Sequence, residues 1–329
     1  MPTRGRRGHR RSGVFLFLAV IAVVAGVTVA VWRGTGPLPD PPGCTATVAD
    51  HTVDLDPEQA ANASLIAALG VRRGLPARAV SIALATAYQE SKIRNLTSGD
   101  RDSVGIFQQR PSQGWGTAAQ ISDEYYAIGR FYDALQKIHG YQTMRITEAA
   151  QKVQRSGFPE AYEDHAADGR ALASALTGYS HAKFSCVVHS SVGDVSSERR
   201  AADGLTPRAD RVRFDLRRVF GPLPLGGYAP EGVSTGHMAG SAHYEGRAVD
   251  IFVRPVNADN KRKGWAIASY LVANARRLHI DHVIFDKRIW SAGTRSEQRW
   301  RAYDPGNGPG NRATREHRDH VHVDVVRGS

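Results

Sequence analysis

Three histidines lie within six positions near the C-terminus, in the stretch REHRDHVHVD from Arg315 to Asp324. The HVHVDV part alternates polar and apolar residues, which predicts a β-strand whose side chains point alternately to opposite faces. On such a strand His320 and His322 share one face, and Asp324 follows them there. Two imidazoles on one face are either solvated or half of a metal site, so further ligands would have to come from elsewhere.

Candidate ligands occur upstream, in SAHYEGRAVD from Ser241 to Asp250. His243 and Asp250 are seven residues apart, and Gly246 between them allows a sharp backbone turn. Together with His322 they supply two imidazoles and one carboxylate, and a water in the fourth position would complete an open tetrahedral zinc site. Zinc in such a site lowers the pKa of its bound water to about 7 and polarises a carbonyl group, which suits peptide hydrolysis.

This order of residues resembles a group of zinc peptidases. His-x6-Asp, followed far downstream by His-x-His, is typical of the group that contains D-alanyl-D-alanine carboxypeptidases, penicillin-insensitive murein endopeptidases and the hedgehog signalling domain. The resemblance covers the C-terminal third of the chain and implies that zinc binds to His243, Asp250 and His322. It also implies that His320 supports the site or stabilises the transition state.

The general base is left open by the resemblance. Carboxypeptidases of this group carry a glutamate three residues before the last ligand, where this chain has the shorter Asp319. Glu316 matches the hedgehog arrangement and is preferred slightly, and His320 is a third candidate. Arg247 either binds a substrate carboxylate or pairs with Glu245, and Asp324 either orients a ligand histidine or ends a solvated strand. The histidines expected to carry no metal are His237, His279, His282 and His317.

A second chemical candidate is Glu90, in ATAYQESKIRNL, near the end of a helix expected to begin at Pro76. A turn-rich stretch follows from Gly99 to Gly116. Cleavage of a glycosidic bond needs a protonated carboxyl group near neutral pH, and a partly apolar environment supplies one by raising its pKa. Glutamates near helix ends are common, so Glu90 alone is weak support.

The wider pattern resembles the lysozyme-like fold of soluble lytic transglycosylases and goose-type lysozymes. Glu90-Ser91 is followed by Gly105-Ile-Phe-Gln108, and the likeness covers most of the segment between Cys44 and Cys186. It implies an all-α domain with Glu90 as general acid. The residues that it places in the glycan groove are Gln108, Gln109, Tyr162 and Trp115.

The product of glycan cleavage depends on whether a second carboxylate lies near Glu90. Asp100 and Asp102 are the candidates to position a water molecule, which would make a hydrolase. If they only cap the turn, as Asp commonly does in Gly/Ser-rich loops, the 6-hydroxyl of the sugar attacks instead and the product carries an anhydro end.

Several segments are expected to position these residues. The fold class predicted is multidomain, with a transmembrane anchor, an all-α lysozyme-like domain and an α+β zinc-peptidase-like domain with a small antiparallel sheet. The segments are a basic cytoplasmic tail (1–12), a transmembrane signal anchor (13–32), a Pro/Gly linker (33–43), the lysozyme-like domain (44–186), a linker (187–207) and the zinc-peptidase-like domain (208–329).

Charge and cysteine content favour an exported protein. Five arginines in the first eleven residues account for nearly half of the net charge of +11, and the next twenty residues from Gly13 carry no charge. That pattern predicts a single-pass anchor with the bulk of the chain outside the cytoplasm, or alternatively a cleaved signal peptide. Outside the cytoplasm Cys44 and Cys186 are expected to form a disulfide. Basic residues outside the tail show no stripe, which disfavours a nucleic-acid partner.

Both resemblances lead to one polymer. The sequence therefore predicts a membrane-anchored, bifunctional peptidoglycan hydrolase that cuts the glycan strand with a Glu general acid and the stem peptide with a zinc-activated water. The alternatives are that one domain is catalytic while the other binds the wall, or that the chain is a zinc-containing scaffold without activity. The expected partners are peptidoglycan and, through the N-terminal helix, the membrane.

Overall fold

The structure is a computed structural model that describes residues 40–189, 198–307 and 310–328. Residues 42–329 form one compact unit. The expected tail (1–12) and transmembrane anchor (13–32) lie outside the described residues. Among the helices of the described ranges, none is both long and apolar enough to cross a membrane.

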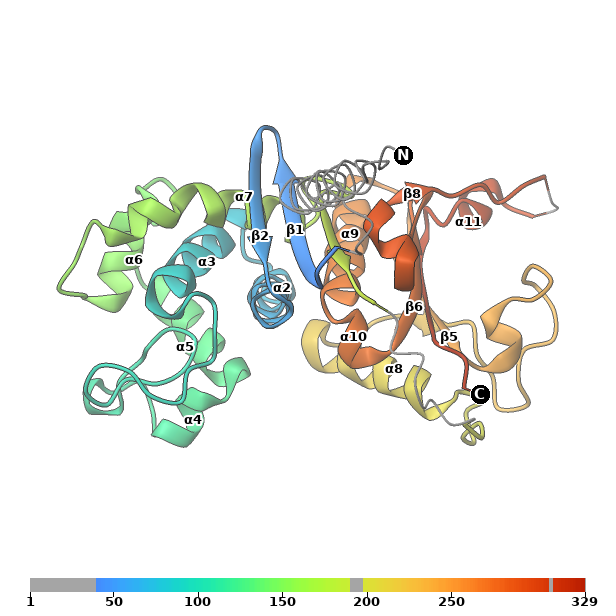
Figure 1. Ribbon diagram of the computed structural model, residues 1–329, viewed down its shortest axis with the longest axis horizontal. Coiled ribbons are helices and arrows are strands. Elements are labelled where there is room, and N and C mark those ends of the chain that lie inside the picture. Colours follow the sequence, from blue (N-terminus) through green and yellow to red (C-terminus); the bar gives the residue numbers. More distant parts are fainter. Residues whose placement is uncertain (1–39, 190–197, 308–309, 329) are drawn as a thin grey trace, which may run out of the picture. The chain divides into compact units, whose positions relative to one another are not determined.

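Helices dominate the N-terminal half (Figure 1). They are α2 (Pro57–Arg72), α3 (Ala77–Ser91), α4 (Ala118–Ser122), α5 (Glu124–Gln136), α6 (Ile146–Gln154) and α7 (Ala166–Leu176), with 3₁₀ turns at Pro111–Gln113 and Ala161–His165. Helix α2 begins where it does because the Asp56 side chain accepts hydrogen bonds from the first-turn backbone. Helices α3 and α7 pack closely, since a Cβ at Gly169 would lie 2.6 Å from the carbonyl oxygen of Ser81.

The prediction of an all-α N-terminal domain is wrong. A three-stranded antiparallel sheet, in the order β2-β1-β3, consists of β1 (Gly43–Val48), β2 (His51–Leu55) and β3 (Phe184–Val187). The stretch CTATVADHTVDL forms β1 and β2 because its Thr and Val residues suit a strand and every second side chain is directed inward. Ala49, with φ of 53°, lies in the tight turn between them.

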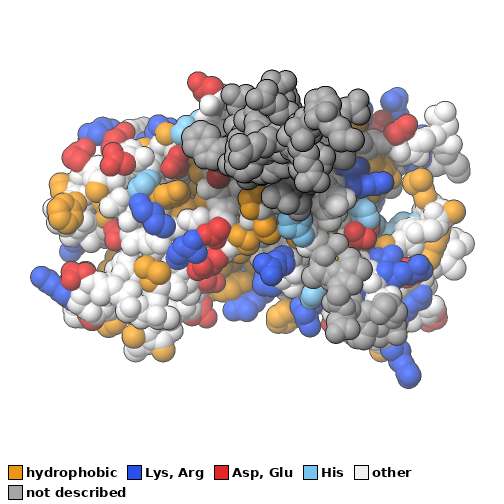
Figure 2. All heavy atoms as spheres, viewed as in Figure 1, with side chains coloured by type: hydrophobic (Ala, Val, Ile, Leu, Met, Phe, Trp, Pro, Cys, Tyr) orange, Lys and Arg blue, Asp and Glu red, His pale blue; other side chains and the backbone are white. Residues whose placement is uncertain are grey.

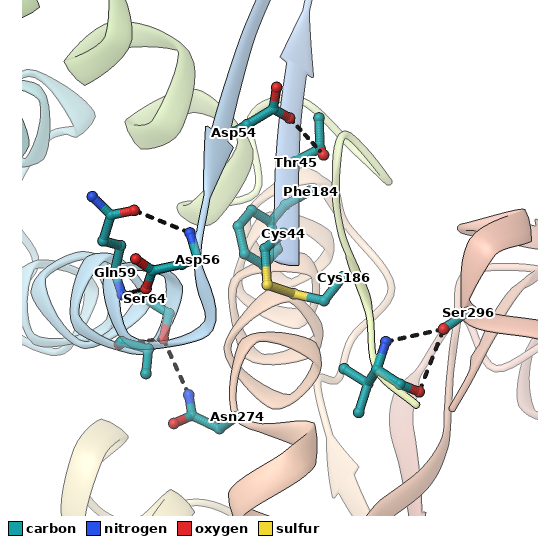
Figure 3. The surroundings of a disulfide bond; sticks show 12 residues. Cys44, Thr45, Asp54, Asp56, Gln59, Ser64, Phe184, Cys186, Asn274 and Ser296 are labelled. Carbon is teal, nitrogen blue, oxygen red and sulfur yellow. Dashed lines mark hydrogen bonds between the residues drawn. A yellow bond between two sulfur atoms is a disulfide. The ribbon is translucent and has the colours of Figure 1, made fainter. Parts of the chain in front are cut away.

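A disulfide joins Cys44 and Cys186 (Figure 3). The two residues lie directly opposite each other in the register of β1 and β3, and both are buried. The bond therefore fastens a strand at the start of the compact unit to one that is 142 residues further along the chain.

The C-terminal half contains a six-stranded antiparallel sheet in the order β4-β5-β9-β6-β7-β8. Its strands are β4 (Leu225–Gly226), β5 (Ala248–Phe252), β6 (Ile280–Phe285), β7 (Arg288–Ser291), β8 (Arg301–Ala302) and β9 (His320–Val325). The helices of this half are α8 (Pro207–Phe220), α9 (Ala258–Ala273), α10 (Ala275–Leu278) and α11 (Arg312–Arg315), with 3₁₀ turns at Ala242–Glu245 and Gly293–Gln298.

Strand β9 is buried along its whole length, which gives its two faces different roles. Val321 and Val323 belong to the hydrophobic core on the face that α9 covers. His320, His322 and Asp324 alternate with them and therefore occupy the opposite face. A strand in the middle of the sheet thus holds three polar side chains in fixed positions.

Hydrogen bonds connect β3 with the C-terminal half. The indole of Trp290 donates to the carbonyl of Cys186 at 3.0 Å, and the indole of Trp300 donates to the carbonyl of Phe184 at 2.7 Å. Asn274 also donates to the hydroxyl of Ser64 in α2 (Figure 3). On the face shown in Figure 2, basic and acidic side chains are interspersed over the described surface.

Candidate functional site

The C-terminal candidate is assembled from β5, β9 and the turn that precedes β5. Asp250 and His322 are directly paired across the two strands. His243 lies in the 3₁₀ turn, where the hydroxyl of Ser241 accepts its backbone N–H and Gly246, with φ of 68°, directs the chain into β5. Residues separated by about 80 positions are thereby brought to one point.

Three potential ligand atoms converge there. Nε2 of His243 lies 3.2 Å from Oδ1 of Asp250 and 3.0 Å from Nδ1 of His322. Nδ1 of His322 lies 3.2 Å from the same Oδ1. Ligand bonds of about 2.0–2.1 Å in a tetrahedral zinc site place neighbouring ligand atoms roughly 3.3 Å apart. The described separations fit that geometry.

Hydrogen bonds on the outer side of the two imidazoles determine which ring nitrogen carries the hydrogen and which offers a lone pair to the cluster. Nδ1 of His243 is 2.7 Å from the carbonyl of Gly227, which can only accept, so this nitrogen carries a hydrogen. Nε2 of His322 is 3.3 Å from the Asp324 carboxylate, which fixes the hydrogen there in the same way. In the neutral imidazoles, two nitrogen lone pairs then face the Asp250 oxygen, and this arrangement requires a cation or an added proton between them.

Burial and hydrogen bonding act in opposite directions on these groups. Burial acts to lower the pKa of His322, but its hydrogen bonds to Asp250 and Asp324 outweigh burial and raise it to about 9. Burial likewise acts to raise the pKa of Asp250, and hydrogen bonds from His243 and His322 hold it well below its usual value. Without a metal ion, a proton on His322 supplies the positive charge that the cluster requires.

Gly227 fits closely against the site. A Cβ at this position would lie 2.3 Å from Cε1 of His243, and its φ of 81° is in the left-handed region. Only glycine allows the carbonyl to approach the imidazole so closely.

A second layer supports His322. Oδ1 of Asp324 accepts hydrogen bonds from the backbone N–H of His282 at 3.1 Å and from its Nδ1 at 3.0 Å. Asp281 lies 3.5 Å from the same imidazole nitrogen. Asp281, His282 and Asp324 form another group whose ligand atoms lie close together. Asp324 is thus fixed on both sides and orients a candidate ligand.

Asp319 and His320 form a dyad beside the three candidate ligands. Nδ1 of His320 is 2.8 Å from Asp319, whose other oxygen accepts from Arg254 and Thr314, each at 2.9 Å. This leaves Nε2 of His320 directed toward the cluster, 3.8 Å from Oδ1 of Asp250. His320 also lines a pocket of about 290 Å³ together with His243 and His322.

The other predicted residues of this half are placed differently. Glu316 is buried and forms ion pairs with Arg312, Arg318 and Lys287, at 2.9, 2.9 and 3.5 Å, and these cations lower its pKa despite burial, which acts to raise it. Arg247 lines the pocket, but its guanidinium pairs with Glu245 at 2.6 Å. Of the three candidate bases, His320 is the one that the fold directs into the pocket.

Three histidines that were expected to carry no metal, His237, His282 and His317, also line this pocket. His237 stacks on His243 with ring centroids 3.9 Å apart, and its side chain belongs to a possible ligand group with His243 and Asp250. His317 lies 4.6 Å from His320 by ring centroids, and burial lowers its pKa to about 3. The sequence signal for His317 was its place in REHRDHVHVD, whereas His237 lies in an irregular loop without a periodic pattern.

In the N-terminal half, Glu90 lies in the last turn of α3. The hydroxyl of Tyr162 donates to Oε1 of Glu90 at 2.6 Å. Burial raises the pKa of Glu90, and hydrogen bonds from Tyr162 and Gln154 oppose the rise without cancelling it. The neighbouring Ser91 donates to the carbonyl of Ile106 at 2.7 Å, which fastens the following turn to the helix end.

Gln108 and Gln109 stabilise that turn. Gln108 donates to the carbonyl of Gly105 at 3.1 Å and accepts from Ser103, and the buried Gln109 donates to Ala127 at 3.3 Å. Tyr162 is therefore the predicted groove residue that the fold brings to Glu90, and Gln154, which the sequence did not indicate, joins it.

The two candidate second carboxylates lie in this turn as well. Asp102 accepts from Arg110 at 2.6 Å and from the backbone of Ser112 at 2.8 Å, so it caps the turn. Asp100 is exposed. These contacts account for both acids without a role at Glu90.

Comparisons with known proteins cover part of the chain. A family described as "VldE, C-terminal domain" matches residues 201–317. No curated protein matches the chain. The matched segment contains His243 and Asp250 and ends before His320 and His322, so the similarity includes one part of the cluster.

Proposed function

We propose that this protein is a bifunctional peptidoglycan hydrolase, with a zinc peptidase centre in the C-terminal half and a glycan-cleaving centre at Glu90. The observation that carries the proposal is the convergence of His243, Asp250 and His322 within 3.2 Å, with hydrogens fixed on the outer nitrogens of the two imidazoles. Such a cluster suits a divalent cation with two nitrogen ligands and one oxygen ligand. The disulfide supports a location in an oxidising compartment.

In the peptidase centre, zinc would be held by Nε2 of His243, Oδ1 of Asp250 and Nδ1 of His322. When bound, zinc lowers the pKa of a coordinated water and polarises a carbonyl group. Asp319 holds the His320 imidazole with Nε2 facing the pocket, where it can accept a proton and pass it to the leaving amine. Asp324 and Gly227 keep the two ligand imidazoles in the required tautomers.

In the glycan centre, Glu90 donates a proton to the glycosidic oxygen as the bond from C1 to that oxygen breaks. Its raised pKa keeps the proton available at higher pH than for an ordinary glutamate. Because Asp102 and Asp100 are accounted for by the turn, we propose that the 6-hydroxyl of the same sugar attacks C1. That hydroxyl returns a proton to Glu90, and the product is a 1,6-anhydro sugar without consumption of water.

The test is incubation of the full chain and purified peptidoglycan with zinc, followed by mass spectrometry of the fragments. Anhydro-ended sugars should disappear in Glu90→Gln, and altered stem peptides should disappear in His243→Ala or with a chelator. His139→Ala, at an exposed position of the helical half, is the matched histidine control and should change neither product. Intact polymer with the wild-type protein would refute the enzymatic proposal and favour a wall-binding scaffold.

A further inference from the structure

A groove of about 770 Å³ lies beside the Glu90 centre and is lined by an unusual number of cations. Arg130 and Lys137 reach it from α5, and Lys152 and Arg155 reach it from the end of α6. The proposed centre uses none of these four side chains. We refer to them as the groove cations.

The groove cations have no paired carboxylate among the described residues. Within residues 40–189, 198–307 and 310–328, no carboxylate forms an ion pair with any of them, and Asp133, which also lines the groove, pairs with Arg73 at 2.7 Å. Among the other arginines of the helical half, Arg72, Arg78 and Arg170 also form no ion pair within the described residues, whereas several are paired with carboxylates. The paired arginines include Arg73, Arg94, Arg110 and Arg145.

Four uncompensated charges around one groove repel one another, and a bound anion would relieve that repulsion. Part of the groove lining around these cations is buried. Nε of Arg130 is buried and has no hydrogen-bond partner among the described residues, while the side chain as a whole is half-buried.

The groove also leads to the proposed acid. Gln154 lines the groove, donates to the carbonyl of Phe107 at 2.8 Å and lies close enough to Glu90 to act against the rise of its pKa. Trp115 lines the groove as well, and the hydroxyl of Tyr126 holds its backbone by donating to its carbonyl at 3.1 Å. An indole face suits the apolar side of a sugar ring, so the groove combines a sugar-stacking surface with cations.

We propose that this groove binds glycan chain that carries anionic substituents, with the groove cations contacting carboxylates or phosphodiester groups while the sugar at Glu90 is cleaved. The proposal rests on the proposed glycan-cleaving function, because that function places the sugar chain at Glu90. It adds a substrate preference, namely for polymer whose stem-peptide carboxylates are free or whose glycan bears a phosphodiester polymer.

The test is sedimentation of the full chain with insoluble peptidoglycan, in a Glu90→Gln background and with a chelator present, so that neither proposed centre cuts the polymer. Three preparations are compared: untreated wall, wall with carboxylates amidated by carbodiimide and ethanolamine, and wall freed of phosphodiesters by hydrofluoric acid. The double variant Lys137→Ala with Lys152→Ala should bind roughly five- to twentyfold more weakly to untreated wall, and added salt should reduce this difference. The control, Arg217→Ala with Arg276→Ala, removes equal charge at exposed positions of the other half.

The outcomes separate the two proposals. Loss of the variant's defect on amidated wall assigns the anion to carboxylates, and loss on acid-treated wall assigns it to phosphodiesters. Equal binding of the two double variants, or a defect that survives both treatments and high salt, overturns the groove proposal. If binding depends on the groove cations but the wild-type protein releases no anhydro products, the groove remains an anion site. Only the proposal of glycan cleavage would then be refuted.

Discussion

Asp250 and Glu90 are both withdrawn from water, but their neighbours differ. Asp250 faces two imidazoles whose hydrogen bonds hold its pKa well below the usual value, although burial acts to raise it. Glu90 faces the neutral groups of Tyr162 and Gln154, and burial raises its pKa. One carboxyl is therefore kept ionised beside basic nitrogens, and the other tends to keep its proton. The C-terminal pocket suits a cation and the N-terminal centre suits an acid.

The largest effect is expected from Asp250→Asn, which removes the only carboxylate among the three candidate ligands. Stem-peptide cleavage should fall about 10⁴-fold or more, because a metal contributes several kcal/mol of transition-state stabilisation. Glycan cleavage in the same samples is the internal control and should be unchanged. Zinc content after dialysis and mass spectrometry of the products measure both effects. Peptide cleavage at the wild-type rate would contradict the ligand assignment.

Glu90→Gln tests the other side of the comparison. Glycan cleavage should fall about 10²- to 10⁴-fold, since glutamine cannot donate the proton, while peptide cleavage persists. Burial also raises the pKa of Glu124, so Glu124→Gln is the matched control and should keep both activities.

The same variant has a stability consequence. When the pKa of a carboxyl group is higher in the folded than in the unfolded protein, the protein becomes less stable as the pH rises from the unfolded-state pKa through the folded-state pKa. Glu90→Gln should therefore raise the melting temperature at pH 7 relative to wild type, and by less at pH 4. Equal shifts at both pH values would show that Glu90 is not titrating as proposed.

A pair of substitutions separates the orienting acids in the C-terminal pocket. Asp324→Asn should weaken zinc binding about 10- to 100-fold, because the tautomer of His322 is no longer fixed. Asp319→Asn should leave zinc affinity unchanged and lower kcat, because Asp319 holds His320. Zinc titration and kinetics on a stem peptide distinguish them. Asp281→Asn, beside His282 in the same layer, is the control and should change zinc affinity least.

The cluster of His243, Asp250 and His322 was easier to anticipate than its surroundings. Strand alternation in HVHVDV predicts that His320 and His322 share a face, and the fold places both on β9. Nothing in the sequence indicates that Gly227 or His237 reaches His243, because both lie in irregular loops whose paths depend on tertiary packing. The ion pairs of Glu316 were not anticipated either: Arg312 and Arg318 lie within four residues of it, and Lys287 comes from the turn between β6 and β7.

The fold was predicted less well at its N-terminal edge. Helical periodicity between Pro57 and Leu176 dominated the interpretation, and the short alternation in CTATVADHTVDL was overlooked. Single short strands are weak local signals because each is stabilised by partners distant in sequence. Here β1 depends on β3, which lies 142 residues away across the disulfide.

The smallest effect is expected from Tyr162→Phe, which sharpens the description of Glu90 as a proton donor. The lost hydrogen bond favours the carboxylate, so its removal raises the pKa of Glu90 further and moves the high-pH limb of glycan cleavage to higher pH. The maximal rate should fall roughly fivefold, as for one neutral hydrogen bond. Tyr132→Phe, a buried tyrosine whose hydroxyl donates to Ile66, is the control and should not move the limb. A shift to lower pH would mean that Tyr162 stabilises the protonated acid, so that this neighbour and burial together raise the pKa of Glu90.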